Sequence, residues 1–150
     1  MEIQIGNVSH IIQLSVAPVF LLTGVGTNLT VLTNRLARII DRSRVLDDRI
    51  GLADSGADPE MLAERDTLHQ RAHLINRAIT LSTSCALLIC LVIAALFVGD
   101  ALGLGLAAPI ALMFVLAMLC LIGSFVFFLR EIFVATRSMS VGISRPPQRH

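Results

Sequence analysis

The stretch AITLSTSCALLICLVIAALFV, residues 78–98, contains no Asp, Glu, Lys or Arg and decides the fold class. A helix of about 20 apolar residues crosses the hydrocarbon core of a bilayer, because it satisfies its own backbone hydrogen bonds. Two further stretches lack these charged residues, one between Glu2 and Arg35 and one between Asp100 and Arg130. The sequence therefore predicts an all-α membrane protein with three transmembrane helices, at about residues 9–33, 78–98 and 107–129.

The composition agrees with a membrane protein. The 150 residues are 55% hydrophobic with a mean hydropathy of +0.77, against about 45–50% apolar residues in soluble domains. The length fits a single membrane domain over residues 1–150. A formal net charge of +1 gives no basic footprint for nucleic acid, so no nucleic-acid partner is expected.

Arginine is distributed unevenly among the connecting segments. Eight arginines lie between the first two predicted spans and four follow the third, whereas the N-terminus and the loop at Asp100 hold none. Because Arg and Lys favour the cytoplasmic side of a membrane, we expect the N-terminus outside and the C-terminus in the cytoplasm. The polar, proline-interrupted residues 138–150 are predicted to form a disordered tail.

The segment between the first two spans, at about residues 34–77, carries a heptad pattern on each of two arms. Gly51 can end the first arm, and Asp58 can cap the second with Pro59 in its first helical position. The pattern predicts a cytoplasmic antiparallel helical hairpin with a short coiled-coil seam, continuous with the two spans. The seam positions are Leu32, Leu36, Ile39, Ser43, Leu46 and Ile50 on one arm and Met61, Arg65, Leu68, Ala72, Ile75 and Ile79 on the other.

Two runs, APVFLLTGVGTNLTVLTNRLARIIDRSRVLDDR at residues 17–49 and RAHLINRAI at residues 71–79, resemble bacterial membrane proteins of the domain of unknown function 2721 family. The similarity covers about residues 11–135, and NRLARIIDRSR is its most specific part. The resemblance implies a small multi-pass membrane protein in the cytoplasmic (inner) membrane of a bacterium. It supplies no activity, cofactor or site residue.

A polar stripe follows the first predicted span. Gln13, Thr27 and Asn34 are separated by fourteen and seven residues, so they share one face of a helix. Polar groups facing lipid tails are costly, and this face should therefore meet protein or water. One reading is a close helix–helix contact, and the other is a weakly selective pore that several copies line together. The candidate residues are Gln13, Thr23, Gly24, Thr27, Thr30 and Asn34.

A cluster of arginines lies at the membrane end of the predicted hairpin. Residues 35–44 and 69–77 carry six arginines against Asp41 alone. They can set the topology, bind anionic lipid head groups, or form a charged ring at a pore mouth. The head-group or pore-mouth candidates are Arg35, Arg38, Arg42, Arg71 and Arg77. The hairpin tip at residues 45–66 has two arginines against seven acidic residues, and it is a candidate surface for a protein partner.

His69 and His73 are four residues apart, a spacing that can ligate zinc on a helix, but no HExxH arrangement accompanies them. We predict no metal site and no cofactor. The sequence also offers no nucleophile with an adjacent base and no phosphate-binding loop, so we expect no enzymatic activity.

These features predict an integral membrane protein that contacts membrane lipids and forms a homo-oligomer. The first functional hypothesis is a passive ion channel or pore lined by the first helix. The alternative is a structural or accessory membrane protein whose cytoplasmic hairpin docks a partner or organises anionic lipid.

Overall fold

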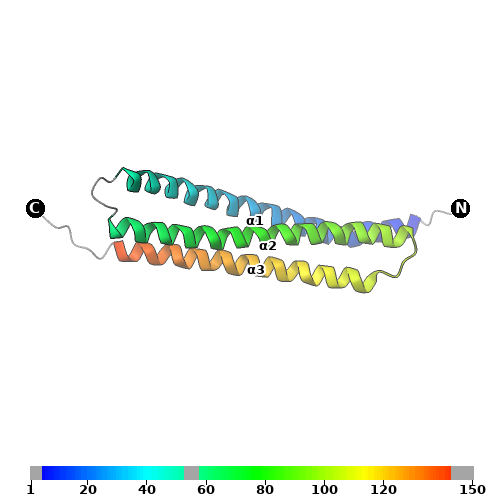
Figure 1. The fold of residues 1–150 in the computed structure, drawn as a ribbon. Helices are drawn as coiled ribbons and strands as arrows, with labels where there is room; N and C mark the ends of the chain where they lie inside the picture. The colour runs from blue at the N-terminus through cyan, green and yellow to red at the C-terminus, as the bar shows by residue number, and fades with distance from the viewer. Residues whose placement is uncertain (1–4, 53–57, 143–150) are drawn as a thin grey trace, which may run out of the picture. The chain divides into compact units, whose positions relative to one another are not determined.

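Three long helices form the described part of the chain in the computed structural model (Figure 1), which describes residues 5–52 and 58–142. Its side chains are described for residues 9–10, 12–52 and 58–136. The helices are α1 (Ile5–Gly51), α2 (Pro59–Ala101) and α3 (Ala107–Gly142). Each is long and apolar enough to cross a membrane, and each predicted span lies within one of them. The all-α prediction with three candidate spans is therefore confirmed.

The helix ends follow the predicted capping residues. α1 ends at Gly51, and α2 begins at Pro59 directly after Asp58. The Asp58 Oδ1 accepts a hydrogen bond of 3.1 Å from the backbone N–H of Glu60, which satisfies one of the free N–H groups of the first turn. The start of the predicted tail belongs to α3, which runs to Gly142. The rest of that tail, residues 143–150, lies outside the described residues.

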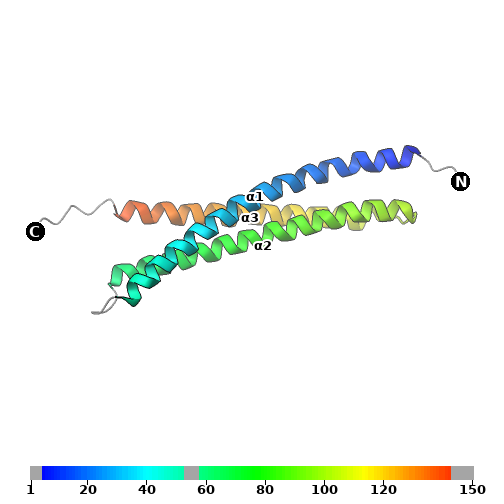
Figure 2. The same ribbon diagram turned by 90° about the horizontal axis from the view of Figure 1, so that it is seen from above.

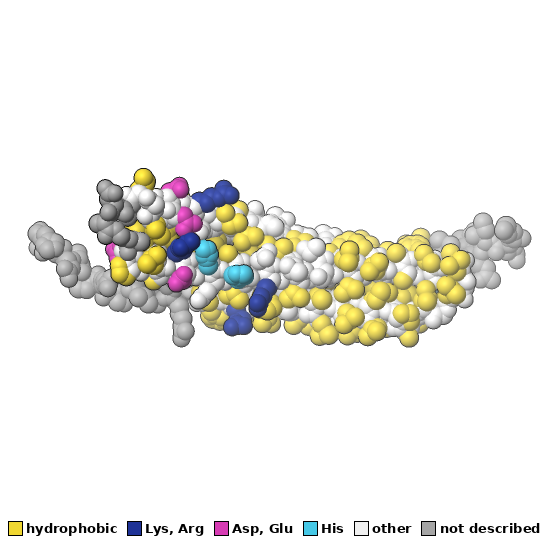
Figure 3. Space-filling view, viewed as in Figure 1, with side chains coloured by type: hydrophobic (Ala, Val, Ile, Leu, Met, Phe, Trp, Pro, Cys, Tyr) yellow, Lys and Arg dark blue, Asp and Glu magenta, His cyan; other side chains and the backbone are white. Residues whose placement is uncertain are grey.

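The chain divides into two compact units, and each contains parts of all three helices. Unit 1 comprises Met1–Val31 and Thr80–Ser124. A small apolar core is buried within it, and large apolar side chains cover its outside. Figure 3 shows such side chains spread over the visible face of this unit. Apolar side chains on the outside as well as in the core suit a surface that meets lipid tails. The buried core of unit 1 comprises Val25, Cys85, Ile89, Ala117 and Leu121.

A tight link joins α2 to α3 within unit 1. The backbone N–H of Leu104 donates to the carbonyl of Gly99 at 2.8 Å, and that of Gly103 donates to the carbonyl of Asp100 at 3.1 Å. Gly103 has a φ of 60°, a left-handed conformation that glycine adopts without a steric penalty. The link reverses the chain at the end of α2.

Unit 2 comprises Leu32–Ile79 and Phe125–His150. Figures 1 and 2 show its α1 and α2 segments side by side and running in opposite directions. The apolar residues of both predicted seams belong to one packed cluster, in which Leu32 and Ile75 are fully buried. Phe127 and Phe128 of α3 also pack against it. The packed unit therefore contains three helical segments, whereas the sequence indicated two.

Candidate functional site

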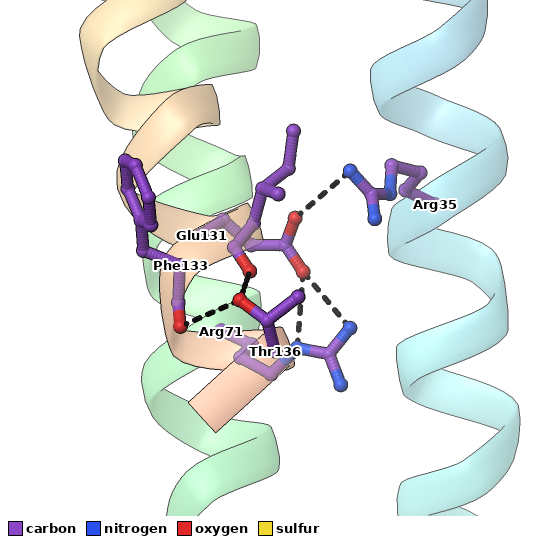
Figure 4. Close-up of polar contacts among 6 residues, drawn as sticks. Arg35, Arg71, Glu131, Phe133 and Thr136 are labelled. Carbon is purple, nitrogen blue, oxygen red and sulfur yellow. Dashed lines mark hydrogen bonds and ion pairs between the residues drawn. The ribbon is translucent and has the colours of Figure 1, made fainter. Parts of the chain in front are cut away.

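A buried group of three charged side chains lies in unit 2, one from each helix (Figure 4). The Glu131 side chain of α3 is 0% exposed. Arg71 of α2 donates to Glu131 Oε1 through Nε at 3.0 Å, and its Nη2 lies 2.9 Å from the same oxygen. The Nη1 of Arg35 in α1 lies 3.2 Å from Glu131 Oε2. We call Arg35, Arg71 and Glu131 the ion triad.

The local sequence explains why Glu131 points inward. Arg and Glu are good helix formers, so the charged pair at 130–131 does not end α3. Phe127 and Phe128 precede Glu131 by four and three residues, and buried Ala135 follows it by four. Residues at these spacings share one face of a helix. Because the phenylalanines pack against the cluster of unit 2, the same face carries the Glu131 carboxylate into it.

The triad has an excess of positive charge. Two guanidinium groups face one carboxylate, and the side chains of Arg35 and Arg71 are only 35% and 21% exposed. The ring of Phe128 lies 5.3 Å from the Arg35 guanidinium carbon, which adds a cation–π contact. Glu131 Oε2 touches Arg35 without an aligned hydrogen bond, and it is the one buried side-chain N or O atom among the described residues that lacks one. Arg71 is therefore the principal partner of the carboxylate.

The predicted arginine candidates divide into two groups. Arg35 and Arg71 hold Glu131, and Arg42 forms an exposed ion pair of 2.7 Å with Glu64. Within the described residues, neither Arg38 nor Arg77 has a carboxylate partner. Internal carboxylates thus engage three of the five candidates. Arg38 and Arg77 are left available for an external anion.

The polar stripe of α1 lies on the exposed side of the helix. In unit 1, no neighbouring atom lies within 4 Å of a Cβ placed on Gly24. The hydroxyl of Thr23 donates to the carbonyl of Val19 at 3.3 Å, and that of Thr27 donates to the carbonyl of Thr23 at 3.1 Å. Thr30 donates in the same way to the carbonyl of Gly26. All six predicted candidates are exposed, namely Gln13, Thr23, Gly24, Thr27 and Thr30 in unit 1 and Asn34 in unit 2.

A second polar contact, missed from the sequence, joins the three helices of unit 1. Asn28 Nδ2 donates to the hydroxyl of Ser82 at 2.9 Å, and the hydroxyls of Ser82 and Ser124 are 2.7 Å apart. Both serines are 0% exposed. Such small polar residues let helices approach and bond inside a membrane.

Glu131 was also missed, although a signal for it exists. It is the one acidic residue after Asp100, and apolar residues lie on both sides of the Arg130–Glu131 pair. An isolated carboxylate at the end of a span needs a cation, and that requirement points to an internal partner.

The three candidate spans and the buried polar contacts define a helical multi-pass membrane protein. Within that class, residues 15–141 match the model of the family described as "Protein of unknown function (DUF2721)", and the chain belongs to this family. No curated protein and no solved structure shows a significant match to the chain.

Proposed function

We propose that the chain self-assembles in the membrane through the exposed stripe of α1, and that the assembly is a passive pore. The observation that carries this proposal is the exposure of polar side chains along a helix that otherwise presents apolar residues. Gln13 is the strongest case, because its amide is exposed and has no hydrogen-bond partner among the described residues. An unsatisfied amide in hydrocarbon costs several kcal/mol. A second copy of the chain, or water inside a pore, would provide hydrogen-bond partners for the amide and remove that cost.

The length of the stripe suits a path across the bilayer. Gln13 and Thr30 are 17 positions apart in one helix, which corresponds to about 25 Å at 1.5 Å per residue. A hydrocarbon core is about 30 Å thick. Several α1 helices around one axis would place these side chains along most of the crossing.

The hydroxyl geometry favours cations over anions in such a pore. Thr23 and Thr27 use their hydroxyl protons on carbonyls of their own helix. Each hydroxyl oxygen then presents acceptor lone pairs toward the exposed face. Because the stripe carries no charged residue, selection should be weak and should rest on these acceptors.

The proposed setting is the inner membrane of a bacterium, with the N-terminus outside and unit 2 in the cytoplasm. The uneven distribution of arginine supports this orientation. In that setting the α1–α2 pair of unit 2 is the cytoplasmic hairpin. A protease added to sealed cells should leave this hairpin intact, and cleavage within residues 45–66 would refute the orientation.

Flux in reconstituted vesicles tests the pore. Wild-type protein should pass K⁺ faster than Cl⁻, and Thr27→Trp should block the path. Leu112→Trp is the matched control, because Leu112 is 62% exposed on α3 and faces away from the core of unit 1. Absence of K⁺ flux through the wild-type protein would refute the pore, and a strict monomer by light scattering in detergent would refute self-assembly.

A second candidate function is a structural protein with a dry axis. The observation that favours it is the internal hydrogen bonding of Thr23 and Thr27 together with the open surface at Gly24, since this combination permits close helix contact without water. The exposed carboxylates of Asp48 and Asp66 in unit 2 would then dock a basic partner. Replacing both by asparagine should abolish that association.

One labelling experiment separates the two functions. The described cysteines are free, and they are first replaced by alanine. Thr27→Cys is then exposed to a thiol reagent that dissolves in water and does not cross lipid. Rapid modification supports a water-filled pore, whereas protection equal to that of Leu112→Cys supports the dry axis.

A further inference from the structure

A groove in unit 2 lies between α2 and α3 and has a volume of about 530 Å³. Its size falls within the range of small-molecule sites, about 300–1,000 Å³. Figure 3 shows histidine and arginine side chains next to one another on the visible face of this unit. The lining residues are Asp66, His69, Gln70, His73, Leu74, Arg77, Arg130 and Val134.

The spacing of the basic residues produces a ladder along the groove. His69, His73 and Arg77 follow one another at intervals of four residues on α2. Such residues share one helical face, with about 6 Å between successive members. Arg130 approaches from α3. The groove therefore presents nitrogen donors from two helices to one space.

The two arginines of the groove are not neutralised by the protein. Within the described residues, neither Arg77 nor Arg130 forms an ion pair, whereas Arg42 and Arg65 of the same unit do. The Arg77 guanidinium carbon lies 5.9 Å from the ring centre of Phe127, which restricts its position. Asp66 is eleven residues before Arg77 on α2, about 16 Å along the helix, too far to pair with it.

The two arginines also occupy a particular level of the chain. Arg77 directly precedes the uncharged run of α2, and Arg130 follows the uncharged run of α3. Both arginines therefore lie at the boundary between an uncharged run and a charged segment, which is the level of the lipid phosphates in a membrane. Leu74 and Val134 add apolar surface to the groove, which suits the glycerol backbone of a lipid. An exposed guanidinium pair at this level matches an anionic group held by the membrane.

We infer that this groove binds the phosphate of an anionic phospholipid. Arg77 and Arg130 grip the phosphate oxygens from opposite helices, because the planar guanidinium fork matches phosphate bidentately. His73 and His69 lie one and two turns farther from the span and donate to the outer oxygens of the head group. The site is separate from the α1 stripe and holds whether or not the chain forms a pore.

Native mass spectrometry of the full chain in detergent tests the site, with phosphatidylglycerol as the probe and phosphatidylcholine as the comparison. Wild-type protein should bind phosphatidylglycerol more tightly than phosphatidylcholine. The double variant Arg77→Gln with Arg130→Gln should bind it about 30-fold more weakly, from two lost arginine–phosphate contacts. The matched control is Arg44→Gln with Arg49→Gln, which removes the same charge from two other arginines of unit 2 that pair with no described carboxylate. It should change binding by less than about twofold.

Three outcomes would overturn the inference. Equal loss in both double variants would show a diffuse charge effect without a site. Equal affinity for the two lipids in the wild-type protein would exclude recognition of an anion. Full competition by free glycerol phosphate at the same concentration as the lipid would assign the groove to a soluble phosphate ester.

A measurement on the unaltered chain guards against a double variant that fails to fold. Phosphatidylglycerol with a photoreactive group on its head group is incorporated into vesicles with wild-type protein. After illumination, label on the peptides that contain residues 66–77 and 130–134 supports the site. Label spread evenly over all peptides at the membrane surface contradicts it.

Discussion

Replacing Glu131 by alanine should lower the free energy of unfolding by about 3–5 kcal/mol, the usual cost of removing one member of a buried ion pair. In the native protein this fully buried carboxylate lies between Arg35 and Arg71. Without it, two partly buried guanidinium groups face each other with no counter-charge. Like charges in such a position repel, and each side chain is only partly exposed to the water that would screen it.

The contact distances also predict different losses of stability for substitutions of the two arginines. Arg71→Ala removes a hydrogen bond of 3.0 Å and a contact of 2.9 Å, so its cost should approach that of Glu131→Ala. Arg35→Ala removes one contact of 3.2 Å from a more exposed side chain, and we expect about half of that loss. Arg42→Ala is the control, because the pair of Arg42 with Glu64 is 52% and 41% exposed. Exposed pairs contribute about 0–1 kcal/mol.

Reversible unfolding in mixed micelles, followed by circular dichroism as sodium dodecyl sulfate is added, measures these differences. A triple variant examines the cause: Arg35→Met, Arg71→Leu and Glu131→Met together should recover most of the loss, because well-packed apolar residues replace a buried ion group at little cost. A Glu131→Ala loss no larger than that of Arg42→Ala would refute the reasoning. A triple variant as unstable as Glu131→Ala would show that packing, and not unpaired charge, is responsible.

The same unfolding assay checks three further predictions. Ser82→Ala should cost about 1 kcal/mol, because Asn28 and Ser124 both lose a bonded partner inside the span; no change would mean that the two find other partners. Gly103→Ala should cost about 1 kcal/mol, since its φ of 60° is unfavourable for alanine, and unchanged stability would show that the link relaxes. Leu32→Ala should cost about 2–5 kcal/mol, because Leu32 is fully buried in the cluster of unit 2. A loss below 1 kcal/mol there would mean that the helices close the cavity.

The spans and helix ends could be predicted because their causes are local. A run without charge indicates a span, and the Gly51 and Asp58–Pro59 signals concern only their own turns. The heptad spacing likewise predicted which apolar residues of the two arms would pack together, from Leu32 to Ile79. In each case a short window of sequence contains the physical reason.

The ion triad could not be predicted in this way, because its members are distant in sequence. Arg71 and Glu131 are 60 residues apart, and their pairing depends on the continuation of α3 beside the other two helices. The predicted third span ends at residue 129, because the charged residues Arg130 and Glu131 follow directly. The same limit applies to the groove, since Arg77 and Arg130 come together only in the folded unit. Spacing along one helix revealed the histidines, but not their neighbour on α3.

The position of Glu131 so late in the chain has a consequence for biogenesis. A ribosome that adds about 5–20 residues per second needs about 3–12 s to travel from Arg71 to Glu131. During that interval Arg35 and Arg71 are already part of the chain, while the rest of α2 and most of α3 up to Glu131 are still being translated. The two cations therefore lack their counter-charge. Arrival of α3 completes the neutralisation. A translation product that ends before Glu131 would retain two partly buried arginines without their internal carboxylate.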